Sequence, residues 1–212
     1  MIEDLSGLHA CPIGEVRYLF RTPSVYDEAK MRRLLARQKV RRPGVIEMRV
    51  AAQAGVAAMA AATGEPEEGE RQKQLIERWY ALLDATDEND IDEPDFEARA
   101  VELAAREGER KRELAEIYPQ IAAIEANLER HWQVYADLIA DRGYWDDVSR
   151  IDVVRLLLVK VGKDGETPRD LKRDDDYLVD QAEYRRIAKR HRVALATFAF
   201  ALMSVEETAS KN

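Results

Sequence analysis

The chain has 212 residues, of which 46% are hydrophobic, 35% are charged and only 7% are aromatic, and its formal net charge is -8. This length is enough to bury a core, and seven prolines and ten glycines are few for a protein built of strands and turns. The negative charge opposes binding to a phosphate backbone, so nucleic acid is not the expected partner. The composition predicts an all-α fold.

The sequence also predicts a cytoplasmic protein without a membrane segment. A single cysteine, Cys11, cannot form an intrachain disulfide or a thiolate metal cluster, which fits a reducing compartment. Residues 1–4 lack the basic and then apolar regions of a secretion signal. The longest apolar stretch, residues 50–62, is mostly alanine and is shorter than the roughly 20 residues that cross a bilayer.

The N-terminal part is predicted to be an arm followed by a first helix. Residues 1–23 form the arm, in which residues 16–20 (VRYLF) are either a strand or an extended segment. Ser24 and Asp27 are spaced like a capping box, which predicts a helix over about 24–39.

A second helix is expected over 45–62, and together with the first it gives an N-terminal helical pair over 24–62. Its alanines and Gly55 would allow a neighbouring backbone to approach closely. Residues 63–66 (TGEP) end it with turn-forming residue types.

A long helical hairpin is predicted over 67–141. Its first helix, about 67–85, carries its apolar residues on one face, and an acidic connector follows. The second helix begins near Asp95 and continues to about Asp141. Pro119 is expected to kink this helix or to divide it after Tyr118, because proline lacks the backbone N–H and its ring clashes with the preceding turn.

A heptad seam marks this long helix. Apart from one histidine, the side chains that recur at spacings of three and four are apolar: Leu114, Ile117, Ile121, Ile124, Leu128, His131, Tyr135 and Leu138. Such a stripe must be covered by another helix. The pattern leaves open whether the cover comes from the same chain or from a second copy in a homo-oligomer.

The C-terminal part, residues 149–203, is predicted to be helical as well. Residues 143–147 (GYWDD) look like a turn, and Ser149 with Asp152 looks like the capped start of a helix over 151–161. A buried strand over 153–159 is the rival interpretation, since periodicity does not assign a short apolar run. A charged loop, a last helix over about 177–203 and a polar tail over 204–212 complete a single helical domain, 1–212.

No catalytic, metal-binding or cofactor-binding residue is predicted, and the chain is not expected to be an enzyme. His9, His131 and His191 are far apart and show no zinc-ligand spacing. The acidic connector lacks the glycine of a calcium loop, and Gly162-Lys163 lacks the first glycine and the hydroxyl residue of a phosphate loop.

Two surfaces are candidates for binding a partner. The first is a basic patch on and after the first helix, which is interpreted either as a solvated face or as a docking surface. The second is the closing segment 193–203, which is apolar nearly all round, so that it is buried in its own core or by a partner. The candidate partner-binding residues are Phe198, Phe200, Leu202, Met203, Arg32 and Arg33, of which Phe200 and Met203 are the apolar pair expected to face a partner.

Three stretches, in this order and spacing, resemble the tail assembly chaperones of long-tailed bacteriophages and prophages. They are residues 18–27 (YLFRTPSVYD) with RRLL at 32–35, residues 144–147 (YWDD) leading to VRLLLV at 154–159, and residues 201–204 (ALMS) before a short acidic end. The resemblance implies a protein without catalytic chemistry in the host cytoplasm. It would bind the tape measure protein, keep this long helical chain soluble and help tail tube subunits to polymerise around it.

The alternative is a helical adaptor or regulatory protein whose basic first helix docks on an acidic protein or on nucleic acid. Salt separates the two hypotheses, because charge-driven binding weakens steeply as salt rises whereas burial of apolar helix faces does not.

Overall fold

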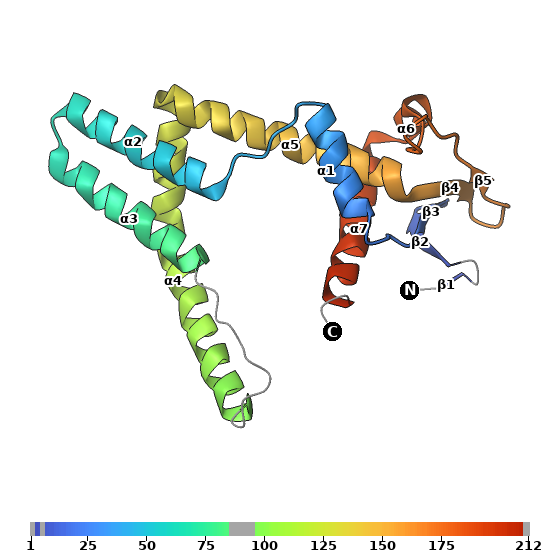
Figure 1. The fold of residues 1–212 in the computed structure, drawn as a ribbon, viewed down its shortest axis with the longest axis horizontal. Coiled ribbons are helices and arrows are strands. Elements are labelled where there is room, and N and C mark those ends of the chain that lie inside the picture. The colour runs from blue at the N-terminus through green and yellow to red at the C-terminus, as the bar shows by residue number, and fades with distance from the viewer. Residues whose placement is uncertain (1–2, 5–6, 85–95, 210–212) are drawn as a thin grey trace. The chain divides into compact units, whose positions relative to one another are not determined.

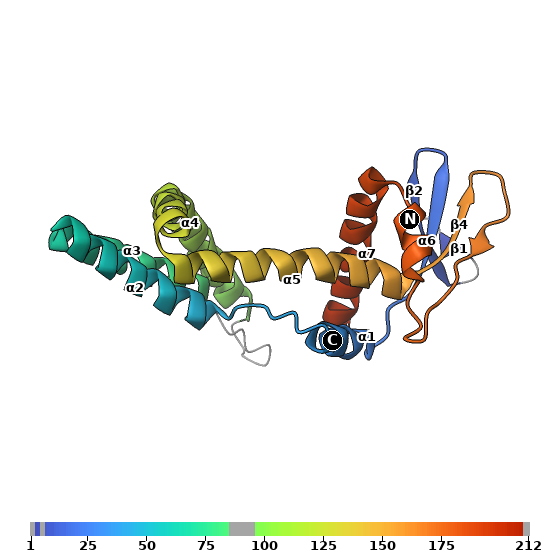
Figure 2. The ribbon, with the colours of Figure 1, turned by 90° about the horizontal axis from the view of Figure 1, so that it is seen from above.

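The computed structural model describes residues 3–4, 7–84 and 96–209 (Figures 1 and 2). Its contacts divide into two compact units. The first, the split unit, consists of Met1–Arg42 and Arg142–Asn212, and the second, the inserted unit, consists of Pro43–Asp141. The sequence predicts one helical domain, whereas the contacts are distributed over two.

The described residues form seven helices and five strands. The helices are α1 (Asp27–Arg37), α2 (Val45–Thr63), α3 (Pro66–Asp84), α4 (Phe96–His131), α5 (Gln133–Leu157), α6 (Gln181–Arg186) and α7 (Lys189–Ala209). The strands are β1 (Glu3–Asp4), β2 (Leu8–Ile13), β3 (Val16–Arg21), β4 (Leu158–Lys163) and β5 (Arg169–Asp170). The chain is therefore mostly helical, but it is not strictly all-α.

The strands form one antiparallel sheet in the order β1-β2-β3-β4-β5, which belongs to the split unit (Figure 2). The predicted arm is thus a β-hairpin, in which Cys11 pairs with Tyr18. On its other side β3 pairs with β4, so that Tyr18 lies opposite Val161. This pairing provides hydrogen-bond partners for both sides of β3, and it turns an ambiguous sequence pattern into a central strand.

The helix predicted over 151–161 is half helix and half strand. Helix α5 runs without interruption from Gln133 through the expected turn at 143–147 and ends at Leu157, and β4 begins at Leu158. Ser149 does not cap a helix, since its hydroxyl donates to the carbonyl of Asp146 within α5. The turn and the capped start are therefore wrong as predictions. The single helix predicted over 177–203 is two helices, α6 and α7.

The core of the split unit lies where β2, β3 and β4 meet the C-terminal part of α5, α1 and α7. Phe20 of β3, Leu157 of α5 and Leu195 of α7 are fully buried in one cluster. Helix α1 contributes Met31 and Leu34 to it. The first helix therefore packs within the split unit, whereas α2 belongs to the inserted unit.

The inserted unit consists of α2, α3, α4 and the first residues of α5, and α2 and α3 run antiparallel side by side (Figure 1). The heptad seam is buried here from Ile117 to Leu138, except that His131 is exposed. Its residues share a core cluster with Met48 and Val56 of α2. The chain's own helices thus cover the seam.

Two predictions for this unit are confirmed, and the division of the long helix after Tyr118, one of the two predicted effects of Pro119, is wrong. Gly55 lies against Leu128, as expected for a close approach, and Gly64 ends α2 with a left-handed φ of 74°. Helix α4, however, continues through Pro119 to His131. Pro119 lies on the exposed side of the helix, where water can hydrate the carbonyl that has no N–H partner. The acidic connector beyond Asp84 lies outside the described residues.

Candidate functional site

The net charge of -8 conceals two units of opposite sign. The split unit contains 23 Lys and Arg against 18 Asp and Glu, which gives a formal charge of +5. The inserted unit contains 10 Lys and Arg against 23 Asp and Glu, which gives -13. An anionic partner therefore has a surface to bind even though the whole chain is acidic.

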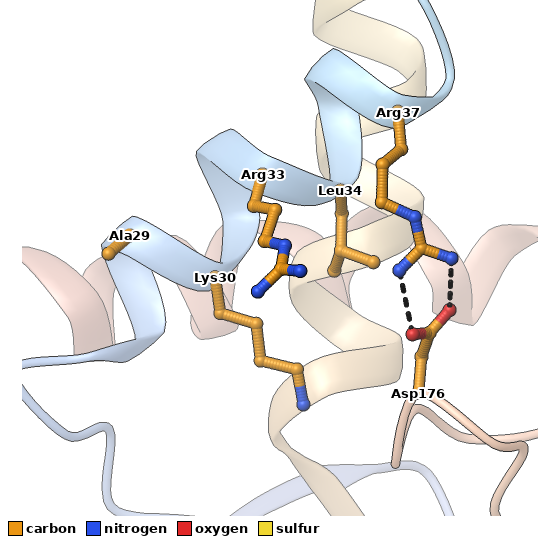
Figure 3. Close-up of a pocket in the computed structure, with 6 residues that line it drawn as sticks. All are labelled: Ala29, Lys30, Arg33, Leu34, Arg37 and Asp176. Carbon is orange, nitrogen blue, oxygen red and sulfur yellow. Dashed lines mark hydrogen bonds and ion pairs between the residues drawn. The ribbon is translucent and has the colours of Figure 1, made fainter.

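Three basic residues of the split unit line an open groove on α1 (Figure 3). Its volume is about 430 Å³, and it is lined by Ala29, Lys30, Arg33, Leu34, Arg37 and Asp176. Lys30, Arg33 and Arg37 follow one another at spacings of three and four, which places them on one face of the helix. Leu34 is buried and anchors this face on the core.

One carboxylate, that of Asp176, enters this row of cations from the loop before α6. Arg37 donates to both of its oxygens, with Nη1–Oδ1 and Nη2–Oδ2 distances of 2.8 and 3.2 Å (Figure 3). These hydrogen bonds lower the pKa of Asp176, burial acts in the opposite direction, and the positive charges of Arg37, Lys30 and Arg33 lower the pKa further. The geometry is the two-pronged one with which arginine binds carboxylates.

A hydrogen-bonded turn fixes the position of Asp176. The Oδ1 atom of Asp174 accepts the backbone N–H groups of Asp176 and Leu178, at 3.1 and 2.9 Å. Tyr177 has a left-handed φ of 60°, and its N–H donates to the Asp174 carbonyl. On the other side, Arg155 of α5 donates to Asp174 Oδ2 at 2.6 Å. Asp176 is therefore held by backbone structure and not by Arg37 alone.

A second contact fixes the C-terminal end of α1. Gln38, the residue after the helix, donates from Nε2 to Oδ2 of Asp152 at 2.7 Å. Asp152 is buried, and this burial raises its pKa, although the hydrogen bond from Gln38 and the charge of Arg155 act in the opposite direction. Arg155 thus lies between Asp152 and Asp174, and one guanidinium supports both attachments of α1.

Lys30 and Arg33 lack such fixed carboxylate partners. Lys30 lies over the ring of Tyr177, with Nζ 5.9 Å from the ring centroid, and Tyr177 is itself 77% exposed. Within the described part of the chain, neither Lys30 nor Arg33 forms an ion pair. Of the two predicted arginines, Arg33 therefore lines the groove, whereas Arg32 pairs with Glu28 at 2.7 Å on the exposed surface of α1.

The four apolar candidates on the last helix lie in or against the core of the split unit. Leu202 is buried, and Phe198 packs on Phe20 with ring centroids 5.2 Å apart. Phe200 and Met203, which were expected to face a partner, are half-buried and pack against the same cluster. The structure brings together Arg33 and two further cations of the basic patch, and it packs the apolar candidates in or against the core, with only Leu202 buried.

The sequence analysis missed a second exposed surface, on α2. Val45, Ile46 and Val50 are 54%, 70% and 56% exposed, although the opposite side of α2 is buried. Among the described helices, α2 alone is long and apolar enough to span a membrane by length and composition, and 28% of the apolar window is buried. The core helix of a water-soluble protein meets the same criterion. Its high content of alanine and valine was the available signal.

The histidines lie in three separate places. His191 is buried, with Nδ1 2.8 Å from the hydroxyl oxygen of Tyr18, and His9 Nε2 is 3.0 Å from Thr22 Oγ1. His131 is exposed at the end of α4. No group of three histidine, cysteine or carboxylate side chains among the described residues is arranged to hold a metal ion.

Comparisons with protein-family models, with curated proteins and with solved structures find no match for this chain. Its function is therefore inferred from its own residues and their geometry.

Proposed function

We propose that this chain is a tail assembly chaperone of a long-tailed bacteriophage or prophage, acting in the host cytoplasm. Its client would be the tape measure protein, which it keeps soluble while tail tube subunits polymerise around it. The proposal combines the resemblance of the three sequence stretches with one structural observation, the exposed apolar face of α2.

This face is a stripe along one side of the helix. Ile46, Val50 and Ala54 are exposed at spacings of four, and Ala57 and Ala61 continue the same side at half-exposed and exposed positions. The stripe is broad enough to pack against the apolar stripe of another helix. Because most of its side chains are small, two backbones can approach closely over a modest apolar area.

A modest apolar area suits a chaperone that has to be displaced. Binding free energy grows with the apolar surface that is buried, and a few small side chains supply little of it per segment. Several copies would then bind along one long client, and tube subunits could displace them one after another. The acidic inserted unit, at -13, would keep such a complex dispersed.

The proposal predicts that a long helical protein is encoded beside this chain's gene, and the test is co-expression with that neighbour. We expect the neighbour to become soluble in a shared complex that persists in high salt, as measured by pull-down and by size-exclusion chromatography with light scattering. Ile46→Glu and Val50→Glu should abolish this complex. Val101→Glu is the matched control, because Val101 lies on α4 of the same unit and is 72% exposed.

Two outcomes would overturn the proposal. One is a neighbour that stays insoluble with the unaltered chain. The other is a soluble complex that Ile46→Glu and Val101→Glu weaken equally, since the α2 face would then have no special role. Far-UV circular dichroism of each variant shows whether it has folded.

A second candidate function, an adaptor that docks on an acidic partner, is favoured by the groove on α1. The groove contains three cations, Lys30, Arg33 and Arg37, but only one carboxylate, that of Asp176, and so carries an excess of positive charge. Complexes formed there would weaken steeply between low and moderate salt, whereas complexes through α2 would not.

A further inference from the structure

We infer that the α1 groove binds an acidic helical segment of a partner protein, which presents two carboxylates one helical turn apart to Lys30 and Arg33, and that Asp176 competes with this segment for the groove. The inference rests on the second candidate function, whose site it specifies, and it does not depend on the α2 face.

The number of charges in the groove argues for two carboxylates. Three cations line it, and Asp176 neutralises one of them through its paired hydrogen bonds with Arg37. Two positive charges remain, on Lys30 and Arg33. A ligand with two negative charges would complete the neutralisation without leaving a like charge in excess.

The spacing of these cations argues for a helical ligand. Lys30 and Arg33 are three residues apart on α1, which separates their Cβ atoms by about 5–6 Å. Carboxylates at positions i and i+3 or i+4 of a second helix have a similar separation, so two ion pairs can form side by side. The exposed ring of Tyr177 lies beside Lys30, one of the lining residues, and offers an apolar contact to the aliphatic part of a glutamate.

The carboxylate already present argues for a protein partner rather than a nucleic acid. Arg37 holds Asp176 in the geometry that it would use for an aspartate or glutamate of a partner. A phosphate backbone is bound by many cations along its length, whereas this groove has three, one of which Asp176 already neutralises.

Asp176 competes with the ligand through its charge while it stays on Arg37. Its carboxylate lies in the same groove as Lys30 and Arg33, so it attracts their positive charges and repels an incoming carboxylate. The turn around Asp174 holds Asp176 at this position. Removal of this charge should therefore strengthen ligand binding, whereas removal of a cation should weaken it.

The experiment measures fluorescence anisotropy of a labelled alanine-based peptide of 18 residues whose glutamates are paired at i and i+4, titrated with the full chain at low salt. We expect Lys30→Gln and Arg33→Gln each to weaken binding about two- to fivefold, the size expected when one exposed ion pair is lost. Asp176→Asn should strengthen binding by a similar factor. Arg32→Gln is the matched control on the same helix and should leave the affinity unchanged.

Three results would overturn the inference: equal losses for Arg32→Gln and Arg33→Gln, weaker binding by Asp176→Asn, or equal binding of the same peptide with glutamine in place of glutamate. A single-stranded oligonucleotide that binds more tightly than the peptide, and that loses affinity in Arg33→Gln, would also overturn it in favour of nucleic acid. Salt-dependent self-association that Arg33→Gln abolishes would support it and would identify the acidic segment as one in a second copy.

These outcomes are distinguishable from those of the chaperone test. Failure of the groove variants to change peptide binding leaves the salt-resistant solubilisation through α2 untouched. Conversely, an insoluble neighbour says nothing about an effect of Arg33→Gln on the peptide. Unchanged thermal melts of the four variants would show that the fold is retained.

Discussion

Gly55 offers the sharpest test of packing in the inserted unit. A Cβ atom added to Gly55 would lie 2.5 Å from Leu128 Cδ2 and 2.7 and 2.8 Å from Cδ1 and Cγ of Trp132. Ordinary carbon–carbon contacts are about 3.5–4.0 Å, so the methyl group is about 1 Å too close to three atoms. Leu128 is fully buried, which leaves it no space in which to move.

The expected loss of stability is the difference between two opposing effects. Overpacking of a closed core costs about 1–3 kcal/mol. Alanine returns up to about 1 kcal/mol, because glycine is the poorer helix former. Gly55→Ala should therefore lower the free energy of unfolding of the inserted unit by about 1–2 kcal/mol, and each kcal/mol lowers Tm by roughly 4–8 °C in a unit of this size.

The measurement is urea and thermal unfolding followed by far-UV circular dichroism, with Gly108→Ala as the control. Gly108 lies inside α4 of the same unit, and a Cβ atom there meets nothing within 4 Å. This control should raise the free energy of unfolding by about 0.5–1 kcal/mol. If both substitutions raise stability, the close approach between Gly55 and Leu128 is refuted.

Three further substitutions test the split unit by urea denaturation. Asp27→Asn should lower the free energy of unfolding by about 1–2 kcal/mol at pH 7. Burial acts to raise the pKa of Asp27, but the hydrogen bonds from Arg21 and Ser24 lower it below its ordinary 3.8, so the ionised carboxylate stabilises the fold. This stabilisation by the Asp27 carboxylate is present above pH 3.8 and disappears as the pH falls through the lowered pKa of the folded state. The loss of stability caused by Asp27→Asn should therefore be smaller in acid. Asp152→Asn should lower the free energy of unfolding by less than Asp27→Asn at pH 7. Burial raises the pKa of Asp152, so its ionised form destabilises the fold as the pH rises through that pKa. A larger loss of stability for Asp152→Asn than for Asp27→Asn would contradict this contrast. Tyr18→Phe should cost about 1–2 kcal/mol by removing the buried hydrogen bond to His191, and an unchanged urea midpoint would show that this bond is immaterial.

Most of the inserted unit could be predicted because its signals are local. The spacing of Ile121, Ile124 and Leu128 identifies a buried helix face, and Gly64 marks the end of α2. The break in the long helix was assigned to the wrong place. Pro119 signals a break but lies on the exposed side, whereas the chain leaves α4 at Trp132, where the sequence contains neither glycine nor proline.

The split unit could be predicted only in part, because its strands depend on distant partners. Val153, Val154 and Leu156–Leu158 are all buried, so both the end of α5 and the start of β4 are apolar and neither periodicity is visible. Only the pairing of β4 with β3 determines where the helix stops. A tertiary contact thus overrides the helical continuation that the sequence favours locally.

The groove on α1 could likewise be predicted only in part, because its two sides come from distant parts of the sequence. Arg33 was predicted because basic residues cluster in a helix that can be recognised from the sequence. Asp176 was not predicted, because Arg37 and Asp176 are 139 positions apart and the carboxylate belongs to a loop with many charges. Its three successive aspartates, 174–176, are the signal that could have drawn attention to it, but they do not indicate which cation they meet.

The pairing of β3 with β4 also has a consequence for the order in which the chain folds during synthesis. Phe20 pairs with Leu158, and after Phe20 the ribosome must add 138 residues to reach Leu158. At 5–20 residues per second this takes roughly 7–28 s. The inserted unit is complete by Asp141 and can fold in that interval, while the β2–β3 hairpin waits with the apolar side chains of Tyr18 and Phe20 uncovered. The nascent chain is thus prone to aggregation until β4 has been synthesised, and slowed translation of the middle of the gene would lengthen that exposure.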